Sequence, residues 1–290
     1  MREYIKPKVI AEIGCNHKGD INIAFELIRT AKACGANIVK FQKRNNKELL
    51  TPEQYNSPHP NPINSYGETY GKHREFLEFN VEQHKLLKEF CEKIEIEYST
   101  SVWDVTSAQE IAMLKPDFLK VPSACNNHFA MLEVLRDDFK GEVHLSLGMT
   151  KISEEKEIIN FFKQNNQNDR LVIYSCTSGY PVPFKDVCLK EINRLFKNYD
   201  DEVKAIAFSG HHLGIAIDIA AYALGAEYIE RHFTQDRTWK GTDHAASLEP
   251  MGLEKLVRDL NATFESLSYK SSEILDIEKV QRKKLKYRKS

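Results

Sequence analysis

Short apolar runs rich in β-branched residues recur along the chain, and each is followed by a stretch with helical periodicity. Runs of four or five such residues are typical of buried strands. The stretches between them repeat apolar residues every three or four positions, which is typical of helices that cover a sheet. The eight runs are Val9–Ile13, Ile38–Gln42, Ile96–Thr100, Phe118–Val121, Val143–Ser146, Leu171–Ser175, Ala205–Ser209 and Tyr228–Arg231.

Three of the intervening helices are well marked. Ile21–Cys34 carries apolar residues on one face and is followed by Gly35, which favours a helix end there. Val81–Ile94 has the same pattern. Ile215–Leu224 is apolar and is closed by Gly225.

Eight strand–helix alternations at even intervals predict an α/β fold, a closed (β/α)8 TIM barrel ringed by helices. A doubly wound open sheet is the alternative, because alternation alone does not prove closure. The count of eight and the lack of a Gly-rich dinucleotide turn favour the barrel. We expect one barrel domain over residues 1–270 and a basic extension over residues 271–290.

The connection after the second strand is much longer than the others. It inserts residues 43–79, which are rich in Asn, Pro, Tyr and His. Long loops in compact domains are usually functional or disordered. This one leaves the carboxyl end of a strand, where barrel active sites are built. We interpret it as a lid or substrate loop, with passive decoration as the alternative.

The composition excludes several classes of protein. The 41 basic and 42 acidic residues nearly cancel, which argues against a nucleic-acid partner or a charged membrane surface. No segment approaches the 18 apolar residues of a membrane span, and the first residues do not resemble a signal peptide. The six cysteines show no paired spacing and are expected to be reduced. We therefore expect a cytoplasmic protein.

Polar residues stand at the carboxyl ends of the predicted strands. In a parallel barrel these ends share one face, so their side chains converge on one site. The candidate site residues are Glu12, Lys40, Gln42, Thr100, Lys120, Ser123, Ser146, Ser178, Tyr180, Ser209, His211 and His232.

Two of these residues suggest a metal site. His211 and His232 follow neighbouring strands, and neutral imidazole is the commonest protein metal ligand. Two ligands are fewer than a closed site needs, so two unrelated polar residues are the alternative. After the eighth strand, Asp243 and His244 can reach the metal or its waters. Cys15 is a further candidate ligand, although an inert thiol is the simpler interpretation.

Two lysines suggest an anion site. Lys40 and Lys120 each lie inside an apolar strand, where an unpaired charge would be unfavourable. A carboxylate such as Glu12 can supply the counter-charge. The surrounding Ser and Thr hydroxyls favour instead a small phosphorylated carboxylate.

The motifs at these positions resemble those of the sialic acid synthases, the nonulosonic acid synthases that join phosphoenolpyruvate to a sugar aldehyde. The match runs nearly end to end through the barrel, and several ordered motifs at compatible spacings are highly specific. They are Ala11–His17, Val39–Gln42, Lys120–Ser123, Leu147–Met149, Cys176–Pro181, Ala223–Ala226, Glu230–Asp236 and Gly241–Pro250.

The resemblance implies roles for the residues at matching positions. His211 and His232 match the family's metal ligands, and Lys40 and Lys120 match the lysines that hold phosphoenolpyruvate. Glu12 aligns with an acidic residue at the reacting centre. The remaining matches are Asp243 beside the metal and, as polar lining for phosphate and carboxylate, Thr100, Ser123, Ser146, Ser178 and Ser209.

The implied reaction condenses phosphoenolpyruvate with an open-chain aldose such as N-acetylmannosamine to give a nonulosonic acid and phosphate. The resemblance favours Mn²⁺ or Mg²⁺ as a Lewis acid on the aldehyde and a homodimer as the assembly. Glu12 would position or deprotonate the water that captures carbon 2.

The chain departs from the family pattern at three points. Gly210 stands where the family commonly has an acidic residue, and Cys125 stands where some members carry a second catalytic glutamate. We also expect no C-terminal antifreeze-like domain, because the sequence stops at Ser290. The alternatives are a synthase for another 3-deoxy ulosonic acid, a catalytically silent barrel that binds a sugar phosphate, and an aldolase with a Schiff-base lysine.

Overall fold

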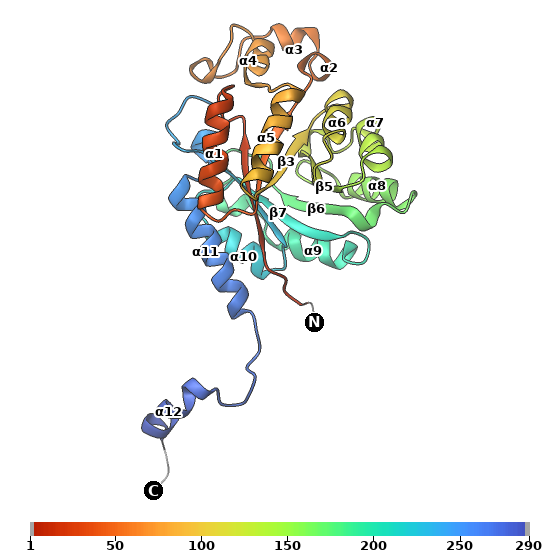
Figure 1. Cartoon of the computed structure of the whole chain (residues 1–290). Helices are drawn as coiled ribbons and strands as arrows, with labels where there is room; N and C mark the ends of the chain where they lie inside the picture. Colours follow the sequence, from red (N-terminus) through yellow and green to blue (C-terminus); the bar gives the residue numbers. More distant parts are fainter. Residues whose placement is uncertain (1–2, 288–290) are drawn as a thin grey trace.

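The computed structural model describes residues 3–287 and contains a closed barrel of eight parallel strands (Figure 1). Each strand pairs with the next along the chain, and β1 pairs with β8. The predicted barrel is therefore confirmed, and all eight predicted runs form strands. The strands are β1 (Lys8–Gly14), β2 (Ile38–Lys43), β3 (Glu97–Val102), β4 (Phe118–Val121), β5 (Glu142–Ser146), β6 (Leu171–Cys176), β7 (Ala205–Gly210) and β8 (Tyr228–His232).

Helices surround the barrel (Figure 1). The side chain of Asp20 caps α1 by accepting a hydrogen bond from the backbone of Asn22, and Asn80 and Gln83 form a capping box on α5. The helices around the barrel are α1 (Ile21–Ala33), α5 (Val81–Lys93), α6 (Val105–Ala112), α7 (Phe129–Glu133), α8 (Ile152–Lys163), α9 (Lys190–Tyr199), α10 (Ala216–Ala223) and α11 (Pro250–Ser266).

Short helical turns complete the connections. Four are 3-10 turns and one is a π-turn that continues α7. They are η2 (Ser123–Cys125), the π-turn η3 (Val134–Asp138), η4 (Asn168–Arg170), η5 (Phe184–Asp186) and η6 (His244–Ala246).

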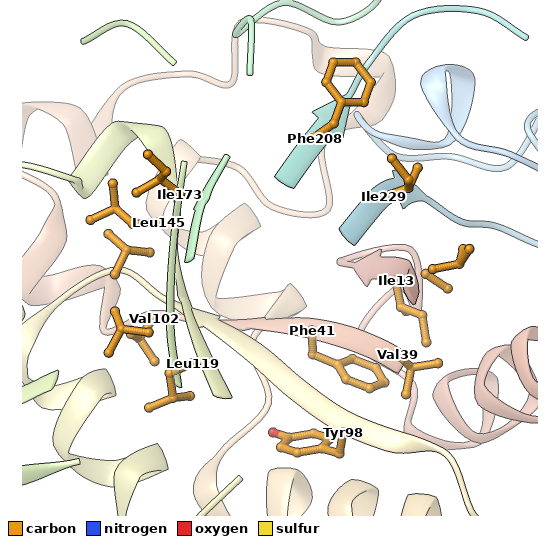
Figure 2. Close-up of a cluster of buried hydrophobic side chains, with 14 of the residues drawn as sticks. Ile13, Val39, Phe41, Tyr98, Val102, Leu119, Leu145, Ile173, Phe208 and Ile229 are labelled. Atoms are coloured by element: carbon orange, nitrogen blue, oxygen red, sulfur yellow. The ribbon is translucent and has the colours of Figure 1, made fainter. Parts of the chain in front are cut away.

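Side chains alternate along each strand between two cores. The outward faces pack against the helices, and Figure 2 shows part of this outer core, including Val39, Phe41, Tyr98, Leu119 and Ile173. The inward faces fill the barrel interior with Ile10, Ile38, Phe118, Val172, Tyr174, Ala205, Ala207 and Tyr228. Two positions beyond Ile10, Ile38, Phe118 and Tyr228, the next inward side chains line the site at the carboxyl ends of the strands; they are Glu12, Lys40, Lys120 and Glu230.

The inserted segment forms a small helical cap at the carboxyl end of the barrel (Figure 1). It contains α2 (Asn46–Leu49), α3 (Pro52–Asn56), η1 (Pro62–Asn64) and α4 (Tyr70–Leu77). We call residues 43–79 the lid segment.

The C-terminal part leaves the barrel after α11, and α12 (Asp276–Leu285) lies away from it (Figure 1). The last residues of the predicted basic extension, 288–290, lie outside the described range. Within residues 3–287, no helix is long and apolar enough to span a membrane.

Candidate active site

A cavity of about 470 Å³ opens at the carboxyl ends of the strands. Its walls come from all eight strands or the loops that follow them, and from the lid segment. It brings together most of the residues predicted from the sequence, namely Glu12, Lys40, Gln42, Lys120, Ser123, Ser146, Ser178, Tyr180, Ser209, His211, His232 and Asp243.

Two buried lysines lie at the floor of the cavity, and each has a carboxylate partner. Lys40 forms an ion pair with Glu12 and donates to Ser101 Oγ at 2.7 Å. Lys120 Nζ lies 3.0 Å from Glu230 Oε2, and Lys40 Nζ lies 3.8 Å from the same oxygen. The counter-charge considered in the sequence is therefore present, and the floor is a compact network of two ammonium groups and two carboxylates.

Burial and pairing shift the pKa values of this network in different directions. Burial disfavours the charged form of Lys40, but Glu12 and Glu230 outweigh it and raise the pKa of Lys40. Burial dominates at Lys120, so the pKa of that ammonium is lowered despite Glu230. Glu230 is buried too, yet the two lysines hold its pKa well below the usual range. Glu230 is consequently ionised at neutral pH.

Glu230 was not among the candidate site residues, although it bridges both lysines. Its position in the sequence carried a usable signal. It is an acidic residue inside the apolar run of β8, two positions before His232, so both side chains point inward. Ser209 Oγ donates to its second oxygen at 3.1 Å, which completes its hydrogen bonding.

The hydroxyl lining lies mainly between β4, β5 and β6. Ser123 Oγ accepts a hydrogen bond from the backbone of Gly148 at 3.0 Å. A Cβ at position 148 would lie 2.5 Å from Ser178 Oγ and 2.6 Å from Ser123 Oγ, so only glycine allows these two hydroxyls to approach. Ser123 and Ser178 line the cavity, and Gly148 lies behind them.

Two predicted site residues do not line the cavity. Thr100 pairs in register with Phe41 and faces the outer core, because side chains alternate along β3; the neighbouring Ser101 faces the cavity instead. His244 turns away from the cavity, with Nδ1 2.7 Å from Thr234 Oγ1. Asp243, one residue earlier, does line it.

The two predicted metal ligands lie side by side, with imidazole centroids 5.5 Å apart. His211 Nδ1 lies 3.2 Å from the carbonyl oxygen of Thr177, so Nδ1 carries the hydrogen and Nε2 keeps its lone pair. Burial lowers the pKa of His211 to about 4, which keeps the ring neutral at pH 7.

His232 also fits a metal ligand. Its Nδ1 is buried and has no hydrogen-bond partner within residues 3–287, and Asp243 Oδ2 is 4.0 Å away. No group of three His, Cys, Asp or Glu side chains that could hold a metal occurs in the described part of the chain. The residues therefore fit an open site in which solvent or substrate completes the coordination.

The departure at Gly210 has a steric basis. A Cβ there would lie 2.8 Å from the ring of His212. His212 is fully buried on the outer face, where its Nε2 is 3.2 Å from Asp218 and 3.0 Å from Arg231. Arg231 also pairs with Asp218. Asp218 on α10 thus supplies an acidic group near this position. Its contacts with His212 and Arg231 hold together the ends of the strands that carry His211 and His232.

Of the two cysteines discussed from the sequence, Cys125 is buried and Cys15 is partly exposed. Cys15 borders the cavity and accepts a hydrogen bond from Arg44 Nη2 at 2.7 Å, and burial raises the pKa of Cys15 to about 12. Burial also raises the pKa of Cys125 to about 12. Neither thiol is ionised at neutral pH, which favours the inert interpretation given for Cys15.

Residues 43–79 were expected from the sequence to act as a lid or substrate loop, but the individual residues of the outer half of the cavity were not predicted. It is lined by residues of the lid segment and by Trp103, which follows β3. Arg74 donates to Tyr70 Oη at 3.0 and 2.8 Å and has no carboxylate partner among the described residues. The indole nitrogen of Trp103 is buried without a hydrogen-bond partner in the same range. The remaining lid residues on this wall are Arg44, His59, His73 and Leu77.

Comparisons with known proteins agree with this geometry. Residues 27–272 match the model of the NeuB family. The chain is 40% identical to N-acetylneuraminate-9-phosphate synthase of Mus musculus over 283 residues, which is 96% of this chain and 76% of the relative. It is 33% identical to N,N'-diacetyllegionaminic acid synthase of Campylobacter jejuni, covering 87% of this chain and 74% of that protein.

The fold also matches solved structures. The crystal structure of the N-acetylneuraminic acid synthetase from Leptospira borgpetersenii in complex with citrate superposes with a TM-score of 0.80 at 30% identity, covering 97% of this chain and 93% of that chain. This chain belongs to the NeuB family and is a transferase of the N-acetylneuraminate synthase type, a phosphoenolpyruvate-dependent nonulosonic acid synthase.

Proposed function

We propose that the acceptor is an open-chain N-acylated aldose of the N-acetylmannosamine type, and that the product is a sialic acid-type nonulosonic acid. The observation that carries this proposal is the convergence of Lys40, Lys120, Glu230, His211 and His232 on one cavity of about 470 Å³. This volume is in the usual range for small-ligand sites. It has room for a three-carbon donor beside a sugar.

The donor would bind at the floor. Its phosphate and carboxylate would take hydrogen bonds from Lys40, Lys120 and the hydroxyls of Ser123 and Ser178. Carbon 3 of the enol then forms a bond to the aldehyde carbon. Water adds at carbon 2, and the carbon 2 centre releases inorganic phosphate as it becomes a ketone. Glu12 would orient this water and accept its proton.

A divalent ion, Mn²⁺ or Mg²⁺, would be held by His211 and His232, with Asp243 nearby. When bound, the ion supplies Lewis-acid polarisation of the acceptor aldehyde. The open coordination described above suits such hard cations as well as it suits zinc. Exhaustive chelation is expected to stop phosphate release, and added Mn²⁺ is expected to restore it.

The experiment measures phosphate release from phosphoenolpyruvate and N-acetylmannosamine for the wild type and for His232→Ala. We expect the variant to lose at least about 100-fold in turnover, because a Lewis acid stabilises the transition state by several kcal/mol. Mn²⁺ should raise the melting temperature of the wild type but not of the variant. His128→Asn, which changes a histidine outside the cavity, is the control. A fully active His232→Ala variant would show that the metal assignment is wrong.

The outer half of the cavity favours a second candidate acceptor, the same aldose with a terminal phosphate. Arg74 and the Trp103 indole nitrogen are donors that the described residues leave without an acidic partner. The lysines at the floor are already paired with carboxylates, so Arg74 is the available cation on the acceptor side. The name of the Mus musculus relative specifies a 9-phosphate product, whereas that of the Campylobacter jejuni relative does not.

Comparing N-acetylmannosamine with its 6-phosphate separates the two candidates. If the phosphorylated aldose is the acceptor, Arg74→Ala should lower kcat/KM for it by about 10- to 100-fold, the range of a charge-assisted hydrogen bond. The same variant should leave the unphosphorylated aldose within about threefold. Lys72→Ala, on the exposed side of α4, is the matched control. Testing further aldoses in this assay covers the other ulosonic acids.

We also propose a cytoplasmic homodimer. All six cysteines are free thiols, which suits a reducing compartment. Light scattering of the purified protein would measure the assembly, and a monomer at micromolar concentration would exclude the dimer.

A further inference from the structure

A polar column occupies the barrel interior directly beneath Lys120. Lys120 Nζ lies 3.5 Å from the centroid of the Tyr174 ring, on β6, and both side chains are buried. The same ammonium donates a hydrogen bond to Glu230 Oε2 at 3.0 Å. Lys120 therefore contacts both a carboxylate and the face of an aromatic ring.

The ring of Tyr174 is itself fixed from below. Its hydroxyl lies 2.6 Å from His144 Nδ1, and His144 Nε2 lies 3.2 Å from Glu142 Oε2. A carboxylate only accepts hydrogen bonds, so Nε2 carries the hydrogen and Nδ1 accepts from the tyrosine hydroxyl. Lys204 Nζ, 2.7 Å from Glu142 Oε1, closes the column at the amino-terminal end of the barrel.

Aromatic packing holds the histidine in place. The ring of Phe118 stacks on His144 at 3.9 Å, and that of Tyr228 meets it edge-on at 4.8 Å. His144 has no exposed surface. The orientation of Tyr174 is thus determined by both hydrogen bonds and packing, which leaves its ring no freedom to move away from Lys120.

The charges along the column reinforce one another. Burial opposes ionisation of Glu142, but the hydrogen bonds from His144 and Lys204 lower the pKa of Glu142 to about 2. Burial lowers the pKa of His144 to about 4 and keeps the Tyr174 hydroxyl protonated. The Tyr174 hydroxyl donates to His144, and His144 donates to the Glu142 carboxylate. These two hydrogen bonds polarise the tyrosine hydroxyl and increase the electron density of the Tyr174 ring, which faces the Lys120 ammonium.

We propose that Tyr174 is a positioning residue of the reaction, whose ring face holds the Lys120 ammonium toward the phosphoenolpyruvate subsite. A desolvated ammonium over an aromatic face is stabilised directionally, whereas a carboxylate alone allows the lysine to swing. His144 and Glu142 act through Tyr174 by fixing the plane of its ring. The role rests on the proposed function, because Lys120 is taken there to bind the donor.

The test compares Tyr174→Leu, which removes the ring face, with Tyr174→Phe, which keeps it. For Tyr174→Leu we expect the KM for phosphoenolpyruvate to rise about 10- to 30-fold, while the KM for the acceptor changes less than about threefold. For Tyr174→Phe we expect the phosphoenolpyruvate KM to stay within about threefold of the wild type. Phe162→Leu, a buried ring on α8 outside the barrel interior, should change neither KM.

Two outcomes would overturn the role of Tyr174. One is a phosphoenolpyruvate KM within threefold of the wild type for a folded Tyr174→Leu variant. The other is a parallel rise of both KM values, which would indicate general loosening of the barrel. If Tyr174→Leu does not fold, calorimetric titration of phosphoenolpyruvate onto Tyr174→Phe decides, because a loss of tenfold or more there would mean that the ring face is not what holds Lys120.

A failure of the proposed function would look different. In that case the wild type itself would neither bind phosphoenolpyruvate nor release phosphate from it. The wild-type measurement therefore distinguishes a failure of the proposed function from a failure of the role of Tyr174.

Discussion

At the scale of single residues, the centre of the site is a charge network rather than a set of free cations. Lys40 and Lys120 meet Glu12 and Glu230 in a region with almost no solvent exposure. A buried ion pair is weak evidence for stability, but removing one partner leaves an uncompensated charge. An incoming phosphate therefore competes with, and can replace, a carboxylate as the partner of the lysines.

This leads to a prediction for Glu230→Gln. We expect the variant to lose about 3 kcal/mol of folding free energy, since both lysines lose a shared partner. Phosphoenolpyruvate should raise its melting temperature more than that of the wild type, because the ligand restores the missing negative charge. Thermal unfolding with and without the ligand measures both effects. An equal ligand-induced shift in the two proteins would contradict the shared role of Glu230.

Glu97, at the amino-terminal end of the barrel, is expected to make the folding stability depend on pH. Glu97 begins β3, where burial, with Asp117 and Glu142 nearby, raises its pKa to about 6. In the unfolded state this carboxyl group has a pKa near 4.5, so it loses its proton at a lower pH than in the folded state. Stability should therefore fall as pH rises from about 4.5 to about 6, and remain lower above that.

Glu97→Gln should remove this loss. We expect a gain of about 1 kcal/mol at pH 7 and almost none at pH 4, after allowance for partial exposure of the side chain. Urea denaturation at the two pH values measures the difference. A gain that is equal at both pH values would point to packing rather than ionisation.

At the scale of secondary-structure elements, the lid segment is tied to the loop after β8. Tyr66 stacks on Phe76 with ring centroids 5.0 Å apart, and Lys240 Nζ lies 4.8 Å from the Tyr66 ring. Tyr66 also donates a hydrogen bond to the backbone of Lys240. These contacts keep the outer wall, with Arg74 and Trp103, over the cavity.

Tyr66→Ala should loosen this wall without touching the floor. An aromatic pair and one hydrogen bond are together worth about 1–2 kcal/mol, so we expect the acceptor KM to rise about 5- to 30-fold. The phosphoenolpyruvate KM should stay within about threefold. Hydrogen exchange over residues 56–77 should increase in parallel. A rise confined to the phosphoenolpyruvate KM would show that the lid does not serve the acceptor.

At the scale of the whole molecule, the barrel carries the stability and the site, while α12 stands apart from it (Figure 1). The apolar side chains Ile277, Val280 and Leu285 are exposed on α12. We expect truncation after Lys270 to leave the melting temperature within about 2 °C and the turnover within about twofold, since little apolar area is lost. Calorimetry and the phosphate assay measure this. A large loss would mean that α12 packs against the barrel or a second copy.

Much of this architecture could be predicted from the sequence, because the barrel depends on local patterns. Short β-branched runs and helical periodicity are properties of neighbouring residues, and they located all eight strands and the bounds of α1, α5 and α10 to within one residue. The rule that parallel strands end on one face then brought twelve of the fourteen candidate site residues to one cavity.

Only the tertiary structure decided which of two neighbouring strand residues faces the cavity, and which groups far apart in the sequence come into contact. Strand register turns Ser101 rather than Thr100 toward Lys40, and it sets Glu230 between two lysines that lie 110 and 190 positions away. Loop packing withdraws His244 and brings Trp103 and Arg74 to the outer wall. Periodicity is encoded locally and can be read along the chain, whereas charge pairing and cavity walls depend on long-range contacts that exist only after the barrel has closed.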